Sequence, residues 1–473
     1  MEALRQRWLD TVVRWRLHPD VPANEQHWAP ELETCSRQRL KDLQNEKLAV
    51  LIPYLLEYSP FYRHKFTAAK LTARDIKSVD DLYKVPPTTK MEMVADVAAN
   101  PPWGSYLAID DRIWKERGWM VFATSGTTAA PRVFRHTTHD MRQWAWNDAR
   151  GLWAMGMRPG QDIALIAFGY APHVFFWGVH YAFNLMGIPV IPGGSLDTAR
   201  RAYFINMFQP TILCATPSYA FYLGNKMLEM GQQPNDSSIT KLLVGGEPGA
   251  SVAATKHRLE ALWGAQVFEF YGTTEVAPTP GGYMCQVGAT QQPYGIHLME
   301  DLHIVELIDP DTFEPLPEGQ RGLSVATNLF SEAAPLLRFV IGDFGQFTTA
   351  PCACGRTHLR ALGGFKGRAD DLLNIRGVTV FPLAIEEVVR GMEVLGDEFV
   401  IEVRNDTGLD ELLVRVEAVT ALDTAEQDRL QAELVQRLRA AIEVRPQVEI
   451  VAPHTIPRAE FKASRIRDQR RDL

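Results

Sequence analysis

One stretch of the chain, residues 242–275, carries the clearest signal of its fold: LLVGGEPGASVAATKHRLEALWGAQVFEFYGTTE. It opens on the short apolar run Leu242–Val244 and closes near a second one, Val267–Tyr271, and both runs have strand-like composition. Between them, Val252–Trp263 is helix-like and is followed by Gly264, a residue typical of helix ends. A strand, a helix and another strand in this order predict two parallel neighbours in one sheet.

The same alternation extends toward the N-terminus. Further strand-like runs are Ile163–Phe168, Ile188–Ile191 and Thr211–Ala215, and Tyr219–Met230 is another helix-like segment. We therefore predict an α/β fold in which a parallel sheet carries helices on its faces. Residues 1 to about 100 are helical and irregular, because Pro86-Pro87 and Pro101-Pro102 break that part into short elements.

Toward the C-terminus the pattern changes twice. After about residue 300 it is β-rich, with strands predicted at Leu302–Leu307, Gly322–Thr327 and Gly345–Thr349. From about residue 370 it becomes an α+β module of a size typical of a small domain. The elements predicted there are strands at Leu373–Arg376 and Val378–Phe381, a helix over Leu383–Met392, a hairpin with arms Phe399–Arg404 and Glu411–Val419 joined through Asn405-Asp406-Thr407-Gly408, a helix over Ala425–Ile442 and a strand at Gln447–Val451. The predicted domains are residues 1–369 and 370–473.

The composition narrows the class of protein. A chain of 473 residues is too long for one hydrophobic core, and 46% hydrophobic with 22% charged residues is the balance of a soluble globular protein. The net charge of −8 argues against bulk binding of nucleic acid. Without an apolar N-terminal signal core or a run long enough to span a membrane, a cytoplasmic location and no membrane partner are expected. Five cysteines in a chain of this length indicate free thiols or metal ligands, not a disulfide scaffold.

A loop rich in hydroxyl groups is the first candidate site. The sequence Thr124-Ser125-Gly126-Thr127-Thr128-Ala129-Ala130-Pro131-Arg132 follows the apolar run Trp119–Ala123, which we interpret as a buried strand. Ser/Thr hydroxyls and bare backbone N–H groups at a strand end form a cradle for phosphate oxygens. Taken alone, the segment is also compatible with an ordinary surface turn.

Four later segments carry complementary chemistry. Tyr271-Gly272-Thr273-Thr274-Glu275 combines a ring that could stack on a base with two hydroxyls and a carboxylate suited to Mg²⁺. In Arg338-Phe339-Val340-Ile341-Gly342-Asp343 the carboxylate could accept from ribose hydroxyls. The others are Gly367-Arg368-Ala369-Asp370-Asp371 with its continuation to Gly377, and Pro457-Arg458-Ala459-Glu460-Phe461-Lys462. Singly, each is compatible with a turn, a helix cap or a solvated charge.

Together, the order and spacing of these five segments resemble the adenylate-forming superfamily of acyl-CoA synthetases, adenylation domains and luciferases. Within it the sequence is most similar to the phenylacetate-CoA ligases. The shared segments are Tyr58-Ser59-Pro60-Phe61-Tyr62, Pro87-Thr88-Thr89-Lys90, Ala215-Thr216-Pro217-Ser218-Tyr219, Gly246-Glu247-Pro248 and Asp370-Asp371 through Arg376-Gly377-Val378 to Pro382. The resemblance covers about residues 50 to 470.

The resemblance implies a reaction and a role for each matched residue. ATP and a carboxylic acid form an acyl-adenylate and pyrophosphate, and a thiol, usually that of CoA, then displaces AMP. Lys462 matches the catalytic lysine that contacts carboxylate and α-phosphate, Glu275 and Thr274 the Mg²⁺ and phosphate positions, and Asp370 the hinge of a mobile small domain. The implied nucleotide contacts are Ser125, Gly126, Thr127, Thr128, Gly246, Glu247, Pro248, Tyr271, Gly272, Thr273, Asp343 and Arg368, and Arg376, Gly377 and Val378 would face the acceptor channel.

The substrate acid is implied less directly. By family position, the acid pocket would be lined by Tyr170, Ala171, Pro172, His173, Gly245, Gly246, Ala277 and Pro278. Small residues beside aromatic ones suit a flat ring, so an aromatic carboxylic acid is expected. We expect a monomer or homodimer that uses ATP, Mg²⁺ and CoA.

Three positions depart from the family pattern. Ala129-Ala130 stand where a glycine and a lysine are usual, Phe461 replaces a glycine before the lysine, and Val340-Ile341 replace a polar pair. Arg132 could supply the missing loop charge. These departures leave alternatives open, in which the acceptor is an amine or a carrier-protein thiol, or the acid is an inorganic one such as nitrite.

The cysteines indicate a second metal. Cys352-Ala353-Cys354-Gly355 is a tight turn with two thiols, and Cys285 and His297 lie earlier in the chain. Three cysteines and one histidine suit a tetrahedral structural Zn²⁺, with His358 as an alternative fourth ligand. This pattern is similar to the one that forms a zinc site in several phenylacetate-CoA ligases. The resemblance implies that the zinc ligands are Cys285, His297, Cys352 and Cys354. Cys35 and Cys214 are expected to be unligated, with Cys214 in the core.

Overall fold

The computed structural model describes residues 2–15, 21–124, 132–170, 174–405, 410–458 and 465–472, without the side chains of residues 277–280 and 471–472. Its N-terminal part is helical and irregular, as predicted. The elements there are α1 (Glu2–Arg14), α2 (Pro30–Glu33), α3 (Arg37–Tyr58), α4 (Pro60–Ala68), the short 3₁₀ turns Ala73–Asp75 and Val79–Lys84, α5 (Lys90–Ala99) and α6 (Asp111–Arg117). None of the helices described combines the length and apolar character that a membrane span requires.

The predicted parallel sheet is confirmed. Its strands are β3 (Ala164–Ile166), β4 (Val190–Pro192), β5 (Ile212–Ala215), β6 (Lys241–Val244) and β7 (Gln266–Thr273). They pair in parallel in the order β7-β6-β5-β3-β4. Because helices cover the sheet, the strands at its centre are mostly apolar, and Leu213 and Leu243 have no exposed surface.

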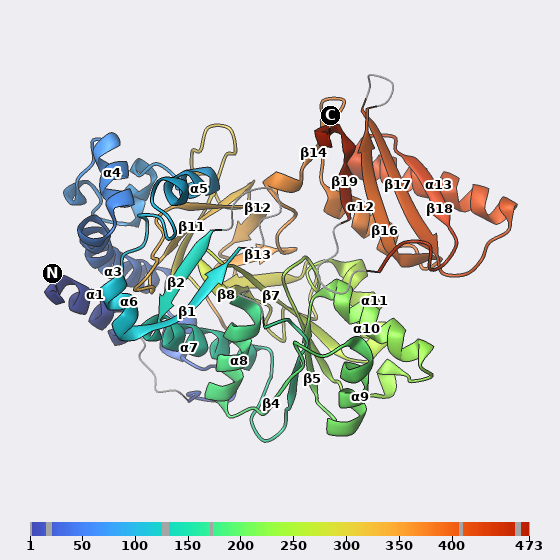
Figure 1. The fold of residues 1–473 in the computed structure, drawn as a ribbon, viewed down its shortest axis with the longest axis horizontal. Helices are drawn as coiled ribbons and strands as arrows, with labels where there is room; N and C mark the ends of the chain where they lie inside the picture. Colours follow the sequence, from blue (N-terminus) through green and yellow to red (C-terminus); the bar gives the residue numbers. More distant parts are fainter. Residues whose placement is uncertain are drawn as a thin grey trace.

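One helix of this region leads from β2 into β3, and four more connect the successive parallel strands. They are α7 (Thr138–Ala154), α8 (Val174–Met186), α9 (Thr198–Phe208), α10 (Pro217–Glu229) and α11 (Ala253–Trp263) (Figure 1). The predicted helices at 219–230 and 252–263 are α10 and α11 within two residues. Gly264 ends α11 with a φ of 63°, a left-handed conformation that glycine adopts at little cost.

The β-rich region extends the same sheet. It contains β8 (Ala277–Tyr283), β9 (Gly295–Leu298), β10 (His303–Ile308), β11 (Arg321–Asn328), β12 (Phe339–Thr348) and β13 (Arg360–Leu362). In the part of the chain described, the full sheet has eleven strands in the order β10-β11-β12-β13-β9-β8-β7-β6-β5-β3-β4. The strand predicted at 345–349 was too short: β12 begins six residues earlier, so Asp343 lies within a strand.

The setting predicted for residues 119–123 was wrong. They form β1 (Gly118–Ala123), but β1 pairs antiparallel with β2 (Val133–Thr137) and lies outside the parallel sheet. Of its residues only Phe122 is fully buried, and Val121 is 37% exposed. The apolar residues of β1 pack against helices and not within the parallel sheet, since Trp119 packs edge-on against Trp144 of α7 and Tyr181 of α8. The hydroxyl-rich segment is therefore the connection between the two strands of this separate hairpin.

The C-terminal part forms a separate lobe with its own hydrophobic core, shown in orange and red in Figure 1. Its elements are the 3₁₀ turn Ala369–Asp371, β14 (Leu373–Ile375), β15 (Val378–Val380), α12 (Pro382–Arg390), β16 (Leu395–Arg404), β17 (Glu411–Ala418), α13 (Thr424–Ile442), β18 (Gln447–Val451), β19 (Ile466–Asp468) and the 3₁₀ turn Gln469–Asp472. Of the strands described there, four form a sheet in the order β18-β17-β16-β19, and β14 and β15 form a separate two-stranded sheet. The predicted hairpin is β16–β17, although most of its turn lies outside the described residues.

Candidate active site

Four predicted segments meet at one edge of the sheet. Because β3, β5, β6 and β7 are parallel, the residues that follow them lie on the same side. These residues include Tyr170 after β3, Thr216 after β5, Gly246 after β6 and Tyr271 near the end of β7. The candidate site is therefore a product of topology, since these segments are far apart in the sequence.

The loop after β6 is held by two carboxylates. Glu269, buried within β7, accepts hydrogen bonds from the backbone N–H groups of Gly249 (3.2 Å) and Ser251 (2.7 Å). Glu247 Oε1 in turn accepts from the Ser218 N–H at 2.7 Å, which joins the loop to the start of α10. Desolvation raises the pKa of both carboxyl groups. The segment predicted to border adenine is thus fixed from two sides.

A second cluster brings together Tyr271, Asp343 and Arg368. The Tyr271 hydroxyl donates to Asp343 Oδ2 at 2.7 Å, and Asp343 and Arg368 pair through their backbones with a side-chain separation of 4.0 Å. Burial raises the pKa of the Tyr271 hydroxyl, and the neighbouring Asp343 charge raises it further. Phe365 stacks on the Tyr271 ring at a centroid distance of 3.6 Å and an interplanar angle of 17°. Sequence reasoning missed Phe365, although its place three residues before Arg368 could have pointed to it.

The carboxylate of Glu275 is paired with a cation. Arg132 Nη2 donates to Glu275 Oε1 at 2.5 Å, and the two side chains are only 7% and 10% exposed. Mg²⁺ in phosphate-transfer sites is commonly held by one or two carboxylates together with substrate phosphates, so a single carboxylate at this edge fits such a site. Nearby, Thr273 Oγ1 accepts from the Val276 N–H at 3.4 Å and shapes the turn that contains Thr274 and Glu275.

Several predicted residues lie outside what the structure describes. These are the loop residues Ser125, Gly126, Thr127 and Thr128, the acid-pocket residues Ala171, Pro172 and His173, and Lys462. Ala277 and Pro278 lie in β8, but their side chains are not described.

The described part of the candidate acid pocket is aromatic. Tyr170 packs against Phe176 of α8 at a centroid distance of 4.3 Å, and Phe168 packs against Phe175 at 4.2 Å. Gly245 lies directly against this wall, since a Cβ there would sit 2.4 Å from the Phe175 ring and 2.9 Å from the Phe270 carbonyl oxygen. A glycine is therefore required at this position for the wall to keep its present form.

The predicted hinge connects the two lobes. Asp370 is paired with Lys90 at 3.1 Å and lies 3.7 Å from Arg368, but its side chain is 59% exposed, so these pairs are weak. The predicted acceptor segment is the turn of the β14–β15 hairpin, in which Arg376 and Gly377 have φ angles of 53° and 81°. Arg376 Nε donates to the Asp410 carbonyl at 2.8 Å within the same lobe.

The four predicted zinc ligands lie together. The ligand atoms of Cys285, His297, Cys352 and Cys354 are all within 4.8 Å of one another, and all four residues are buried. Hydrogen bonding within the group lowers the pKa of the Cys352 and Cys354 thiols and raises that of the Cys285 thiol, so the three cysteines interact directly. The alternative ligand His358 is not one of these four residues, and its Nε2 lies 2.9 Å from the Leu32 carbonyl oxygen.

The spacing of these atoms fits zinc. With Zn–S bonds of about 2.3 Å and Zn–N bonds of about 2.0–2.1 Å, tetrahedral geometry places two sulfurs about 3.8 Å apart and a sulfur and a nitrogen about 3.6 Å apart. The Sγ atoms of Cys285 and Cys352 are 3.9 Å apart, and Cys354 Sγ lies 3.4 Å from His297 Nε2. The remaining cysteines are elsewhere: Cys35 Sγ bonds the Leu32 carbonyl, and Cys214 is buried in β5.

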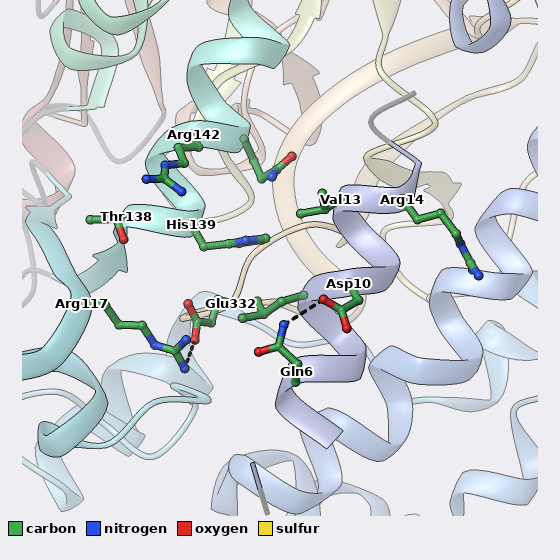
Figure 2. Close-up of a pocket in the computed structure, with 11 residues that line it drawn as sticks. Gln6, Asp10, Val13, Arg14, Arg117, Thr138, His139, Arg142 and Glu332 are labelled. Atoms are coloured by element: carbon green, nitrogen blue, oxygen red, sulfur yellow. Dashed lines mark hydrogen bonds and ion pairs between the residues drawn. The ribbon is translucent and has the colours of Figure 1, made fainter. Parts of the chain in front are cut away.

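A cavity of about 600 Å³ lies apart from this site, between α1 and α7. Arg117 and Thr138, which line it, flank the base of the β1–β2 hairpin, whereas the hydroxyl-rich loop leaves its tip. Figure 2 shows Arg117 beside the carboxylate of Glu332, Arg142 on the other side of Thr138 and His139, and Arg14 directed away. Arg117 is already paired with Glu332 at 2.9 Å, so the lining has mixed charge and indicates no particular ligand.

Comparisons with known proteins agree with this architecture. The profile of the AMP-binding enzyme family matches residues 62–325, and that of the AMP-binding enzyme C-terminal domain matches residues 377–470. The phenylacetate-coenzyme A ligase of Thermus thermophilus is 32% identical over 94% of this chain and 100% of its own length. The enzyme of the same name from Escherichia coli is 32% identical over 93% of this chain and 97% of its own length.

Solved structures give the same result. 2-Hydroxyisobutyryl-CoA ligase in complex with 2-HIB-AMP, in the postadenylation state, is 30% identical and superposes with a TM-score of 0.89 over 96% of this chain and 95% of its own. The same ligase with 2-HIB-AMP and CoA in the thioesterification state gives a TM-score of 0.71 over 95% and 94%. The chain therefore belongs to the AMP-binding enzyme family of adenylate-forming ligases and is similar within it to the phenylacetate-coenzyme A ligases.

Proposed function

We propose that this protein activates an aromatic carboxylic acid with ATP, through an acyl-adenylate, and transfers the acyl group to CoA. The observation that carries the proposal is the convergence of the Tyr271–Asp343–Arg368 cluster and the Arg132–Glu275 pair beside an aromatic wall. In a chain that belongs to the adenylate-forming ligases, this edge supplies groups for a base, a ribose, a phosphate chain and an acid.

Each of the matched residues has a role in the first step, the formation of the acyl-adenylate. Tyr271 and the Gly246-Glu247-Pro248 loop border the adenine, while Asp343 and Arg368 bind the ribose hydroxyls. Ser125, Gly126, Thr127 and Thr128 hold the β- and γ-phosphates, with Thr274 beside them. Glu275 would hold Mg²⁺, which would supply charge to offset that of the leaving pyrophosphate. Lys462 contacts the carboxylate and the α-phosphate, which draws the reacting atoms together.

The two lobes, residues 1–369 and 370–473, change their relative orientation between the half-reactions, with Asp370 as the hinge and Arg376, Gly377 and Val378 at the acceptor channel. The difference between the two TM-scores supports this, since the present orientation is more similar to the postadenylation structure. In that orientation Arg258 of α11 donates to Asp397 at 3.0 Å and to the Met392 carbonyl at 2.6 Å, across the interface between the lobes.

Replacing Arg258 by alanine should slow adenylation by a few-fold and leave thioester formation from supplied acyl-adenylate unchanged, because it removes contacts made only in the present orientation. Single-turnover measurements of the two half-reactions test this. Arg415→Ala is a suitable control, since Arg415 pairs with Glu449 inside the C-terminal lobe. Equal slowing of both half-reactions would argue against the assigned orientation.

A zinc ion bound by Cys285, His297, Cys352 and Cys354 has a structural role in this proposal. Its four ligands leave no open coordination position, as in other structural sites. They come from the segment after β8, from β9 and from the connection between β12 and β13.

The chemical class of the substrate acid is inferred from the residues that line the candidate pocket. Tyr170 and Phe175 supply aromatic rings, and Gly245 lies directly against the Phe175 ring, a lining that suits an aryl acid. A short branched hydroxy acid is a second candidate, because the ligase that superposes at a TM-score of 0.89 was solved with 2-HIB-AMP.

The test of the proposed function is ATP–pyrophosphate exchange with a panel of aryl and short hydroxy acids, followed by mass spectrometry for the CoA thioester. We expect exchange with an aryl acid and a thioester of the same acid. Exchange without a thioester would assign a different acceptor, and exchange only with a hydroxy acid would assign the second acid class. No exchange with any acid would overturn the proposal.

Replacing Gly245 by alanine should raise the KM for the acid about tenfold, because overpacking of this kind costs roughly 1–3 kcal/mol. The added Cβ would displace the Phe175 ring. The KM for ATP should change much less. Gly396→Ala is the matched control, since Gly396 lies in β16 of the C-terminal lobe and its Cβ would approach its nearest neighbour only to 3.4 Å. An unchanged KM for the acid would remove Gly245 from the pocket.

A further inference from the structure

We propose that Arg132 is the resident counter-ion of Glu275 and that it moves from this carboxylate to the β- and γ-phosphates when Mg²⁺ and ATP bind. The inference deepens the proposed function and rests on it. It concerns a contact that joins two segments 143 residues apart in the sequence.

The backbone of Arg132 is fixed at the neck of the hydroxyl-rich loop. The Thr124 N–H donates to the Arg132 carbonyl at 3.0 Å, and the Arg132 N–H donates to Thr124 Oγ1 at 3.1 Å. These two bonds continue the β1–β2 pairing by one residue beyond Ala123 and Val133. The guanidinium therefore extends from a rigid position directly beside the loop that would hold the phosphates.

The ion pair between Arg132 and Glu275 is almost completely shielded from solvent. The side chains of Arg132 and Glu275 are 7% and 10% exposed, and their contact is 2.5 Å long. Arg132 Nε is buried and has no hydrogen-bond partner among the described residues. An unpaired buried carboxylate is costly, so Glu275 needs a counter-ion whenever no metal is bound. Arg132 meets that need with one nitrogen and keeps a second N–H available.

Mg²⁺ and Arg132 would compete for the same carboxylate. Mg²⁺ takes oxygen ligands at about 2.0–2.1 Å in near-ideal octahedral geometry. When the ion occupies Glu275, the guanidinium loses its partner and faces the phosphate chain at the same edge. A planar guanidinium with several N–H donors is well suited to bind phosphate oxygens.

The loop sequence explains why this exchange matters. Ala129-Ala130 occupy positions where the family usually has glycine and lysine, so the loop itself carries no cation. Arg132 is the cation next along the chain, and its side chain is already directed at the magnesium position. When Arg132 moves from Glu275 to the phosphates, its positive charge would take the place of the lysine that the loop lacks.

The test compares two nucleotides by calorimetry. Arg132→Gln should raise the Kd for ATP, measured with excess Mg²⁺, about tenfold, as expected for loss of a charge-assisted hydrogen bond. The Kd for AMP, which has no β- or γ-phosphate, should not change. Arg132→Lys should recover most of the ATP affinity. Equal effects on both nucleotides, or none on ATP, would overturn the proposal.

A double-mutant cycle in thermal unfolding gives an independent readout. Without nucleotide, Arg132→Gln and Glu275→Gln should be strongly non-additive, because each removes the same pair. With saturating ATP and Mg²⁺ the coupling should disappear. A coupling that persists unchanged would make the pair purely structural.

Arg135→Gln provides the matched control. Arg135 lies in β2, three residues after Arg132, is also buried and pairs with Asp111 of α6 at 2.5 Å. It should lower the melting temperature without altering the ratio of ATP to AMP affinity. If the wild-type protein binds neither nucleotide, the proposed function fails and not the role of Arg132 alone.

Discussion

Replacing Lys462 by alanine is expected to lower the rate of ATP–pyrophosphate exchange by about 100-fold or more, because it removes the main charge that stabilises the reacting carboxylate and α-phosphate. The sequence itself supports a special role for this residue. Lys462 is the only lysine after Lys366, and every other basic side chain of that segment apart from His454 is an arginine. A compact ammonium group can fit between two reacting groups where a planar guanidinium cannot.

Two variants sharpen this prediction. Lys462→Arg should stay impaired, since charge alone would not restore the contact. Arg467→Ala, which removes a half-exposed cation a few residues away, should leave exchange unchanged. Thioester formation from supplied acyl-adenylate should survive in Lys462→Ala, because that step no longer joins carboxylate to phosphate. Wild-type exchange in Lys462→Ala would refute the assigned role.

The central fold could be predicted because its signals are local. The strand runs at 211–215, 242–244 and 267–271 are apolar and short, and Gly264 marks a helix end, so β5, β6, β7 and α11 followed from composition alone. β8 was not predicted, since Ala277–Tyr283 contains prolines and glycines that normally break strands. Its pairing with β7 and β9 overrides that local preference.

The candidate site was predictable as a set of residues and not as a set of contacts. Tyr271, Asp343 and Arg368 stand in motifs, and the structure brings them together. Their partners have no comparable signal. Phe365 on Tyr271, Arg132 on Glu275 and Arg258 on Asp397 all join segments that only the sheet topology and the placement of the lobes bring together.

Loss of a zinc ligand should have the second large effect. We expect one zinc per chain in the purified protein and less than about a tenth of that in Cys354→Ser, with a melting temperature lower by on the order of 10 °C. The reason is that three buried sulfurs and one imidazole lie within 4.8 Å of one another, as the ligands of a single metal ion do. Metal analysis and thermal unfolding measure the two quantities.

Cys35→Ser is the control for this experiment, because the Cys35 thiol bonds the Leu32 carbonyl oxygen and a serine hydroxyl can keep that bond. It should retain zinc and stability. Zinc in stoichiometric amount in Cys354→Ser, or none in the wild-type protein, would contradict the assignment.

The zinc variant should also weaken ATP binding, although no ligand touches the nucleotide edge. The ion would join the segment after β8 to the connection between β12 and β13. β8 follows the turn that carries Glu275, and β12 carries Asp343. Loss of the zinc ion would therefore let Glu275, the proposed magnesium ligand, and Asp343, the proposed ribose ligand, move relative to each other. Because Tyr271 bonds Asp343 directly, we expect the affinities for ATP and AMP to fall together in Cys354→Ser. That common loss distinguishes it from Arg132→Gln, which should affect ATP alone.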